Sequence, residues 1–106
     1  MKVFGVLKES GKWIDGLFGK IFKTEDSWTV LCNSEEEARN EAEKMWDRLC
    51  TFDKKESVIT AVKRDFTPAE FNLVKEEYFS VDDDKQLKEI AVSENYNVIE
   101  KFSMQN

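Results

Sequence analysis

The sequence predicts one small α+β domain with a mostly antiparallel sheet, and three observations support this. The chain has 106 residues, which fits a single domain over residues 1–106. Hydrophobic residues make up 41% and aromatic residues 12% of the chain, enough for a core without disulfides or metal. Short β-rich runs alternate with capped helical segments, and no repeat or linker separates them. The predicted element order is β-β-β-α-β-α-α-β.

The first part of the chain reads as strands. Residues 2–8 are β-rich and are followed by Ser10 and Gly11, a pair typical of a turn. Residues 27–32 form a further short strand after a polar turn. Three strands are therefore expected before the first helix.

Residues 12–23 fit either a strand or an amphipathic helix. Their apolar side chains form one stripe at helical spacing, but both faces are apolar if the segment is extended. Gly16 and Gly19 would each cost a helix about 1 kcal/mol relative to Ala, and glycine is common at strand bulges. The preferred interpretation is a bulged strand that returns from the turn at Ser10 and Gly11.

Residues 34–50 give the clearest helix. Ser34 with Glu37 three positions later is a capping box, in which each side chain satisfies an unpaired backbone amide. The apolar residues of the segment recur on one face, and small alanines at its start allow close approach to a sheet. Trp46 is the expected anchor of that contact.

The second half of the chain begins with the strongest strand pattern. Residues 56–65 are apolar on both faces near their middle, which indicates a central strand. Thr67 and the Pro after it begin a helix over 68–79, and an acidic run begins another over 82–93. Even spacing of apolar residues over 96–104 predicts a closing strand.

The chain lacks the residues of most catalytic and metal sites. It contains no histidine, which excludes histidine-based acid–base catalysis, Ser–His and Cys–His nucleophile pairs, and most zinc sites. The stretch from Gly5 to Lys12 fails as a phosphate-binding loop, and the aspartates from Asp82 onward fail as a calcium loop. We expect neither an enzyme nor a cofactor or metal.

The two cysteines and the N-terminus predict a cytoplasmic protein. The N-terminus has neither the apolar run nor the cleavage site of a signal peptide. Cys32 and Cys50 do not have the spacing of a metal or redox motif and fit free thiols in a reducing compartment. Cys32 precedes a helix start, where the dipole would favour a thiolate, but no histidine can act as its base.

Negative charge is concentrated in the helical segments. The formal net charge is −6, and this acidic balance argues against general nucleic-acid binding, which needs a basic face. The helix over 34–50 carries six acidic and three basic residues, and residues 67–106 carry nine acidic and four basic residues. These acids fit solvated helix faces, or a surface that steers a basic protein partner. The candidate steering residues are Glu35, Glu36, Glu41, Glu43, Asp82, Asp83 and Asp84.

The aromatic segment is the second candidate surface. Its apolar residues fit a core, a partner interface or, with Lys12, Lys20 and Lys23, a membrane-lying helix. A core is the preferred interpretation, and no membrane binding is expected because the chain is acidic. If the segment is an interface, the contact residues are Trp13, Leu17, Phe18 and Phe22.

The stretch over residues 34–62 resembles known proteins. Glu36, Glu37 and Ala38, then Trp46 with Leu49, then paired lysines before a strand are similar to small uncharacterised proteins of bacterial mobile elements and phages. The resemblance implies a small accessory protein of a mobile genome, a setting in which compact acidic proteins inhibit host defence by binding a protein.

The sequence thus predicts a non-catalytic protein-binding module. The partner would be a host defence or nucleic-acid-handling protein, and the chain itself would not bind nucleic acid directly. Two alternatives stay open. One is a structural or dimerising accessory protein, including a homodimer through the aromatic segment or a strand edge. The other is a nucleotide- or metabolite-binding protein with a pocket between the helix over 34–50 and the sheet, lined by Trp46.

Overall fold

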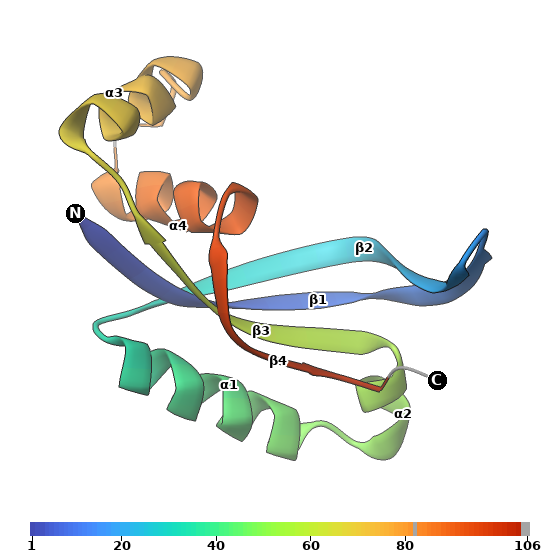
Figure 1. Ribbon diagram of the computed structural model, residues 1–106. Helices are drawn as coiled ribbons and strands as arrows, with labels where there is room; N and C mark the ends of the chain where they lie inside the picture. Colours follow the sequence, from blue (N-terminus) through green and yellow to red (C-terminus); the bar gives the residue numbers. More distant parts are fainter. Residues whose placement is uncertain (82, 105–106) are drawn as a thin grey trace.

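The computed structural model describes residues 1–81 and 83–104 and shows a sheet between two layers of helices (Figure 1). The four strands are all antiparallel and lie in the order β2-β1-β3-β4. The α+β class and the antiparallel sheet are therefore confirmed. The elements are β1 (Lys2–Gly16), β2 (Gly19–Cys32), α1 (Glu35–Arg48), α2 (Thr51–Lys55), β3 (Ser57–Asp65), α3 (Pro68–Glu77), α4 (Asp84–Glu94) and β4 (Asn97–Ser103).

The predicted turn at Ser10 and Gly11 is wrong. Both residues lie inside β1, where a bulge interrupts the pairing with β2. A Ser-Gly pair marks a bulge as readily as a turn, because glycine relieves crowding in both. The chain reverses at Leu17 and Phe18 instead, so the three predicted strands are two long ones. Residues 12–23 are extended except at this reversal, so the helical alternative is wrong. The preferred single bulged strand is wrong as well, because the segment is divided between β1 and β2.

Helix α1 begins at the predicted cap. The Glu37 N–H donates to the Ser34 hydroxyl at 3.1 Å, and the Glu37 carboxylate accepts from the Asn33 N–H at 2.8 Å. The helix ends at Arg48, two residues before the end of the predicted range over 34–50. The five-residue helix α2, which the sequence did not predict, follows Cys50.

The helix over 68–79 is confirmed as α3, and its N-cap Thr67 accepts from the Glu70 N–H at 3.2 Å. The helix predicted over 82–93 is α4, which is capped by Asp83 and spans Asp84–Glu94. Asp82 lies outside the described residues. None of the described helices combines the length and the apolar run that a bilayer crossing needs.

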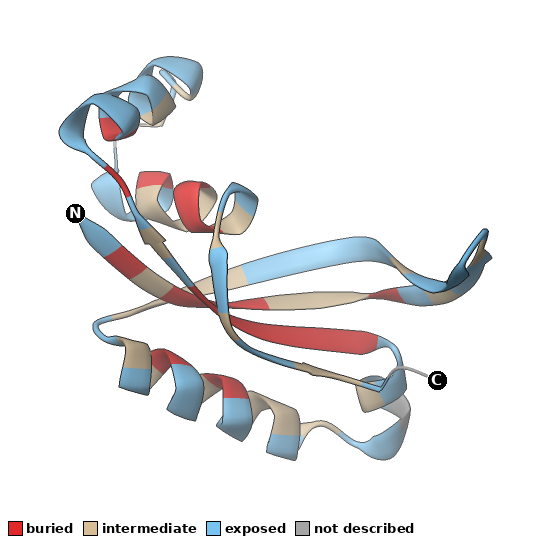
Figure 2. Ribbon diagram, viewed as in Figure 1, coloured by how far each residue is buried: buried red, intermediate tan, exposed pale blue. Residues whose placement is uncertain are grey.

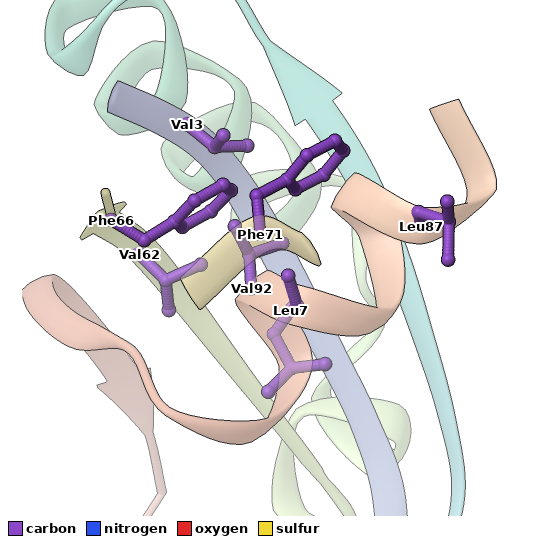
Figure 3. Packing of buried hydrophobic residues seen from close by; sticks show 8 residues of the cluster. Val3, Leu7, Val62, Phe66, Phe71, Leu87 and Val92 are labelled. Atoms are coloured by element: carbon purple, nitrogen blue, oxygen red, sulfur yellow. The ribbon is translucent and has the colours of Figure 1, made fainter. Parts of the chain in front are cut away.

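Strand β3 is central, as predicted, and separates two cores. On the α1 side, Val6 and Ile59 pack against the alanines of α1. On the other side, Leu7 and Val62 pack against α4 and against Phe66, whose ring stacks on Phe71 at 5.3 Å (Figure 3). Figure 2 shows burial concentrated in β3 and in the half of β1 beside it.

Trp46 packs in the layer between α1 and the sheet. Its ring stacks on Phe102 of β4 with centroids 6.0 Å apart, and the Lys54 ammonium lies 5.3 Å from the indole centroid. The side chain is half-buried. Its predicted role as an anchor between helix and sheet agrees with this contact.

Candidate interaction surface

Strands β1 and β2 continue beyond the rest of the sheet. Strand β3 pairs with β1 only as far as Ser10, whereas β1 and β2 pair on to Gly16 and Gly19. Residues 11–24 therefore form a two-stranded hairpin, which we call the arm. Figure 1 shows the arm projecting past both helix layers, and Figure 2 shows its outer end exposed.

A bulge at the base of the arm sets its direction. Ser10 pairs with Asp26 and Gly11 with Thr24, so Glu25 has no partner on β1. An unpaired extra residue bends a strand and increases its twist. The two backbones are so close here that a Cβ on Gly11 would lie 2.0 Å from the Lys23 carbonyl oxygen. Glycine at this position permits the bend.

The turn at the end of the arm carries the two most exposed large apolar side chains described. Leu17 is 90% and Phe18 98% exposed. Gly19 follows with φ +129°, a conformation that residues with a Cβ rarely adopt. The turn is therefore short, and the backbone conformation of Gly19 fixes its shape. Leu17 and Phe18 (together, the tip) are exposed to solvent on this turn.

The base of the arm is fixed to the body. Trp13 and Phe22 pair across the strands with ring centroids 5.0 Å apart, edge to face. The Trp13 indole N–H donates to the Lys55 carbonyl at 2.8 Å, which ties the arm to α2. Nearer the tip, Ile14 and Ile21 pair and stay 43% and 55% exposed. The predicted apolar contact residues thus lie on one arm, two at its base and two at its tip.

A cavity of about 540 Å³ lies where the base of the arm meets the sheet. Trp13 and Phe22 contribute aromatic surface from the arm, but most of the exposed lining is polar and includes the charged side chains of Glu9, Lys20 and Lys101. Val58 and Tyr96 contribute the lining from the body. Burial, and then the nearby Glu9 carboxylate, raise the pKa of Tyr96. We call this cavity the groove. Sequence reasoning missed it, because it joins residues far apart in the chain.

The arm is basic, although the protein is acidic. Lys12, Lys20 and Lys23 outnumber Asp15, the one acid between Gly11 and Thr24. The Lys20 ammonium lies 2.7 Å from the Asp15 carboxylate and holds the pKa of that carboxyl below its usual range. The arm therefore adds a local charge of +2 to a chain of net charge −6.

The predicted acidic residues do not form one surface. Glu35, Glu36, Glu41 and Glu43 lie on α1, whereas Asp83 and Asp84 lie at α4 on the opposite side of the sheet (Figure 1).

Several of these acids already have partners. Glu35 pairs with Lys63 at 3.2 Å, Glu41 with Lys44 at 3.7 Å, and Asp84 with Lys75 at 3.4 Å. Glu36 and Glu43 are exposed and share a helical stripe with exposed Asp47, at i, i+7 and i+11. That stripe is the acidic surface that the fold presents on α1.

Neither cysteine is positioned as a nucleophile. Cys32 is half-buried, and burial, with Glu37 and Glu41 nearby, raises the pKa of its thiol to about 11. Cys50 is exposed and its sulfur accepts from the Asp53 N–H at 3.4 Å, as the cap of α2. Within residues 1–81 and 83–104, no three acidic or cysteine side chains converge as a metal site would require.

No family model, curated protein or solved structure matches this chain. What it can bind has to be argued from its own surface.

Proposed function

We propose that the protein is a non-catalytic protein-binding module that docks through its arm. The observation that carries this is the tip, where Leu17 and Phe18 are 90% and 98% exposed on a turn defined by its backbone. Aromatic side chains are enriched at protein interfaces, where a few buried anchors supply most of the binding energy. An anchor already held in place loses less conformational entropy on binding.

The arm is also unlike an ordinary solvated hairpin. Exposed single apolar residues are common on proteins, but contiguous apolar patches beyond a few hundred Å² are rare on monomers. Here Ile14 and Ile21 extend the exposed apolar surface from the tip toward the base. Lysines border this surface, so a partner with acidic residues around an apolar site would complement the arm.

The finer proposal is that the protein is a phage or mobile-element inhibitor of a host defence or nucleic-acid-handling protein. Its support is the resemblance over residues 34–62 and the exposed stripe of Glu36, Glu43 and Asp47. Proteins that handle nucleic acid carry basic surfaces, and an opposing acidic stripe would speed association with them and select among them.

A capture experiment tests the role of the arm. The tagged wild-type protein and the variant L17S/F18S would be incubated with host lysate, and retained proteins compared by mass spectrometry. The matched control is L73S/F79S, which replaces one Leu and one Phe that are 63% and 85% exposed elsewhere. We expect wild type and control to retain the same protein, and L17S/F18S to lose it. Equal retention by all three would overturn the proposal.

A salt series tests the acidic stripe separately. We expect E36Q/E43Q to slow association with the captured protein, and to reduce the dependence of the rate on salt, because exposed charges act through screened long-range attraction. The control E70Q/E77Q removes two exposed acids from α3 and should leave the rate within error. An unchanged rate in E36Q/E43Q would contradict the electrostatic part alone.

A further inference from the structure

We infer that two copies of this chain dimerise through the inner part of β2, residues 26–32, which we call the edge segment. The two segments pair antiparallel with Thr29 opposite Thr29, so that one sheet continues from copy to copy. The inference goes beyond the proposed function, because it uses the backbone of the edge segment and not the tip of the arm.

Strand β2 forms one margin of the sheet, because the strand order is β2-β1-β3-β4 (Figure 1). The direction of the hydrogen bonds in β1 follows from its pairing with β3. The Gly11 N–H donates to the Glu56 carbonyl, in the chain just before β3, at 2.9 Å. Bonding direction alternates along an antiparallel strand, so odd-numbered residues of β1 bond toward β3 and even-numbered ones toward β2.

The same alternation identifies the unpaired backbone groups of the edge segment. Even-numbered residues of β1 lie opposite even-numbered residues of β2 here, from Ser10 with Asp26 to Phe4 with Cys32. The odd-numbered residues between them therefore direct their N–H and C=O groups away from β1, toward the open margin. These residues are Ser27, Thr29 and Leu31. Only another extended backbone matches the spacing of such a row of groups.

The edge segment has none of the usual protection against pairing. Natural edge strands are protected by charged side chains, prolines or bulges. Residues 27–32 contain no charged residue, no proline and no glycine. The opposite margin, β4, carries Glu100 and Lys101 and has a bulge in its pairing with β3. The outer part of β2 carries Lys20 and Lys23. Association between sheets is therefore directed to the edge segment.

The ends of the edge segment set the register. Glu25 is the extra residue of the bulge, and β2 ends at Cys32. The regular stretch between them is centred on Thr29. A two-fold axis at Thr29 consequently pairs the segment with its copy over its whole length, and places Ser27 of each copy opposite Leu31 of the other. Such an arrangement closes on itself as a dimer, and its two arms point in opposite directions.

This register also covers an exposed aromatic side chain. Trp28 is 60% exposed, although it lies on a strand in the body of the sheet. The Lys8 ammonium, 5.9 Å from its ring centroid, comes from the neighbouring strand and leaves the margin side open. In the dimer Trp28 lies opposite Val30 of the second copy, in a non-hydrogen-bonded pair, where side chains approach most closely. Pairs of an aromatic and a β-branched residue stabilise sheets.

The segment is complementary to itself, which favours a second copy as the occupant. Thr29 lies opposite Thr29, a pair that can form a side-chain hydrogen bond. Asp26 lies opposite Cys32, so no two like charges face each other. The net charge of −6 on each copy opposes association at long range. Salt screens that repulsion and should therefore strengthen the dimer.

Sedimentation velocity over a range of concentrations and salt tests the dimer. We expect wild type to approach twice the 12.4 kDa chain mass as concentration rises, and at lower concentration in high salt. T29K should stay at the monomer mass, because two ammonium groups would face each other. The control V98K adds the same charge to β4, where Val98 is 53% exposed, and should dimerise. A monomeric wild type, or a T29K that dimerises equally well, would overturn the inference.

A charge-swap experiment separates loss of the interface from loss of the fold. T29E alone should also be monomeric, whereas an equal mixture of T29K and T29E should recover the dimer mass, because opposite charges then meet at the axis. Misfolded variants would not recover in this way. A mixture that stays monomeric, with both variants folded by circular dichroism, would overturn the placement of the axis.

Disulfide crosslinking tests the register directly. Residues in a hydrogen-bonded antiparallel pair have Cα atoms about 5.5 Å apart, within the span of a disulfide. In a C32S/C50S background, mild oxidation should join T29C into a covalent dimer and leave the control V98C mostly monomeric. Faster joining of W28C than of T29C would place the axis at Trp28 and overturn the proposed register.

These outcomes are separable from those of the proposed function. The variant L17S/F18S should dimerise as wild type does, and a monomeric L17S/F18S would assign dimerisation to the tip and overturn the inference. A monomeric wild type that captures a lysate protein through the tip overturns the dimer alone. Loss of that capture in a monomeric T29K would show that the edge binds a different protein, which also overturns the dimer. A dimer whose capture ignores the tip supports the inference and overturns the proposed function.

Discussion

Cys32 ends β2 just before the cap of α1, where a helix dipole would be expected to stabilise a thiolate. In the fold the opposite holds, because the thiol is half-buried and lies near Glu37 and Glu41, and its pKa rises to about 11. Iodoacetamide at neutral pH should therefore alkylate exposed Cys50 and leave Cys32 unmodified until urea unfolds the chain. Peptide mass mapping checks this, and rapid labelling of Cys32 in the folded protein would contradict it.

The same thiol gives stability a dependence on pH at the alkaline end. The unfolded chain loses the Cys32 proton near its ordinary pKa of 9.0, whereas the folded chain holds it to about 11. Ionisation then favours the unfolded state progressively as pH rises from 9 to 11. We expect the urea midpoint of wild type to fall more across this window than that of C32S, while the two fall alike below it. Parallel curves throughout would refute the prediction.

At the scale of elements, the arm depends on glycines in two different ways. Gly19 has φ +129° with nothing near its missing side chain, so Gly19→Ala should cost about 1–3 kcal/mol of backbone strain. Gly11 has an ordinary φ but would place a Cβ 2.0 Å from a carbonyl oxygen, so Gly11→Ala should cost more, by forcing the strands apart. Urea unfolding measures both, with Lys12→Ala as the exposed neighbouring control. A Gly11→Ala as stable as this control would contradict the argument.

The helix caps provide a prediction of smaller magnitude. Ser34 and Thr67 each accept one backbone N–H at the start of a helix, at 3.1 Å and 3.2 Å. Replacing either by Ala should lower the free energy of unfolding by about 1 kcal/mol, and replacing it by Asp should restore most of the loss. Thermal unfolding of the three versions at each site checks this. An Ala variant equal to wild type would show that the cap adds nothing.

Caps were predictable from sequence and the strand reversal was not, for a physical reason. A cap is local, because its donor and acceptor lie three residues apart, as Ser34 and Glu37 do. The reversal at Leu17 and Phe18 has two apolar central residues, and the glycines on either side of it fit a bulge as well as a turn. The pairing of β1 with β2 over their full length decides between the two. The Ser10 and Gly11 signal was real, but it marked a bulge.

At the scale of the whole molecule, the parts of the site that the sequence did not predict also depend on contacts between residues far apart in the chain. The apolar contact residues were identifiable, because Trp13 to Phe22 is an unusual local run. The groove at the base of the arm also needs Val58 and Tyr96, which only the fold brings near the arm. The acidic residues were read as one surface, because sequence cannot show that α1 and α4 lie on opposite faces.

The two faces of the sheet also predict how core substitutions combine. Ile59 points to the α1 core and Leu87 belongs to the α4 core, and both are fully buried. Ile59→Val should cost about 0.5–1.5 kcal/mol and Leu87→Ala about 2–5 kcal/mol. Because the sheet separates the two side chains and they share no core cluster, the double variant should lose the sum, to within about 0.5 kcal/mol.

A matched pair within one core gives the contrast. Leu87 and Val62 belong to the same cluster, so Leu87→Ala combined with Val62→Ala should depart from additivity, by roughly 0.5–3 kcal/mol, as the remaining side chains relax into a shared cavity. Urea unfolding of both cycles at one protein concentration makes the comparison. Equal coupling in the two cycles would mean that the sheet does not insulate its faces, and that a change at the α4 core is transmitted to α1 and its acidic stripe.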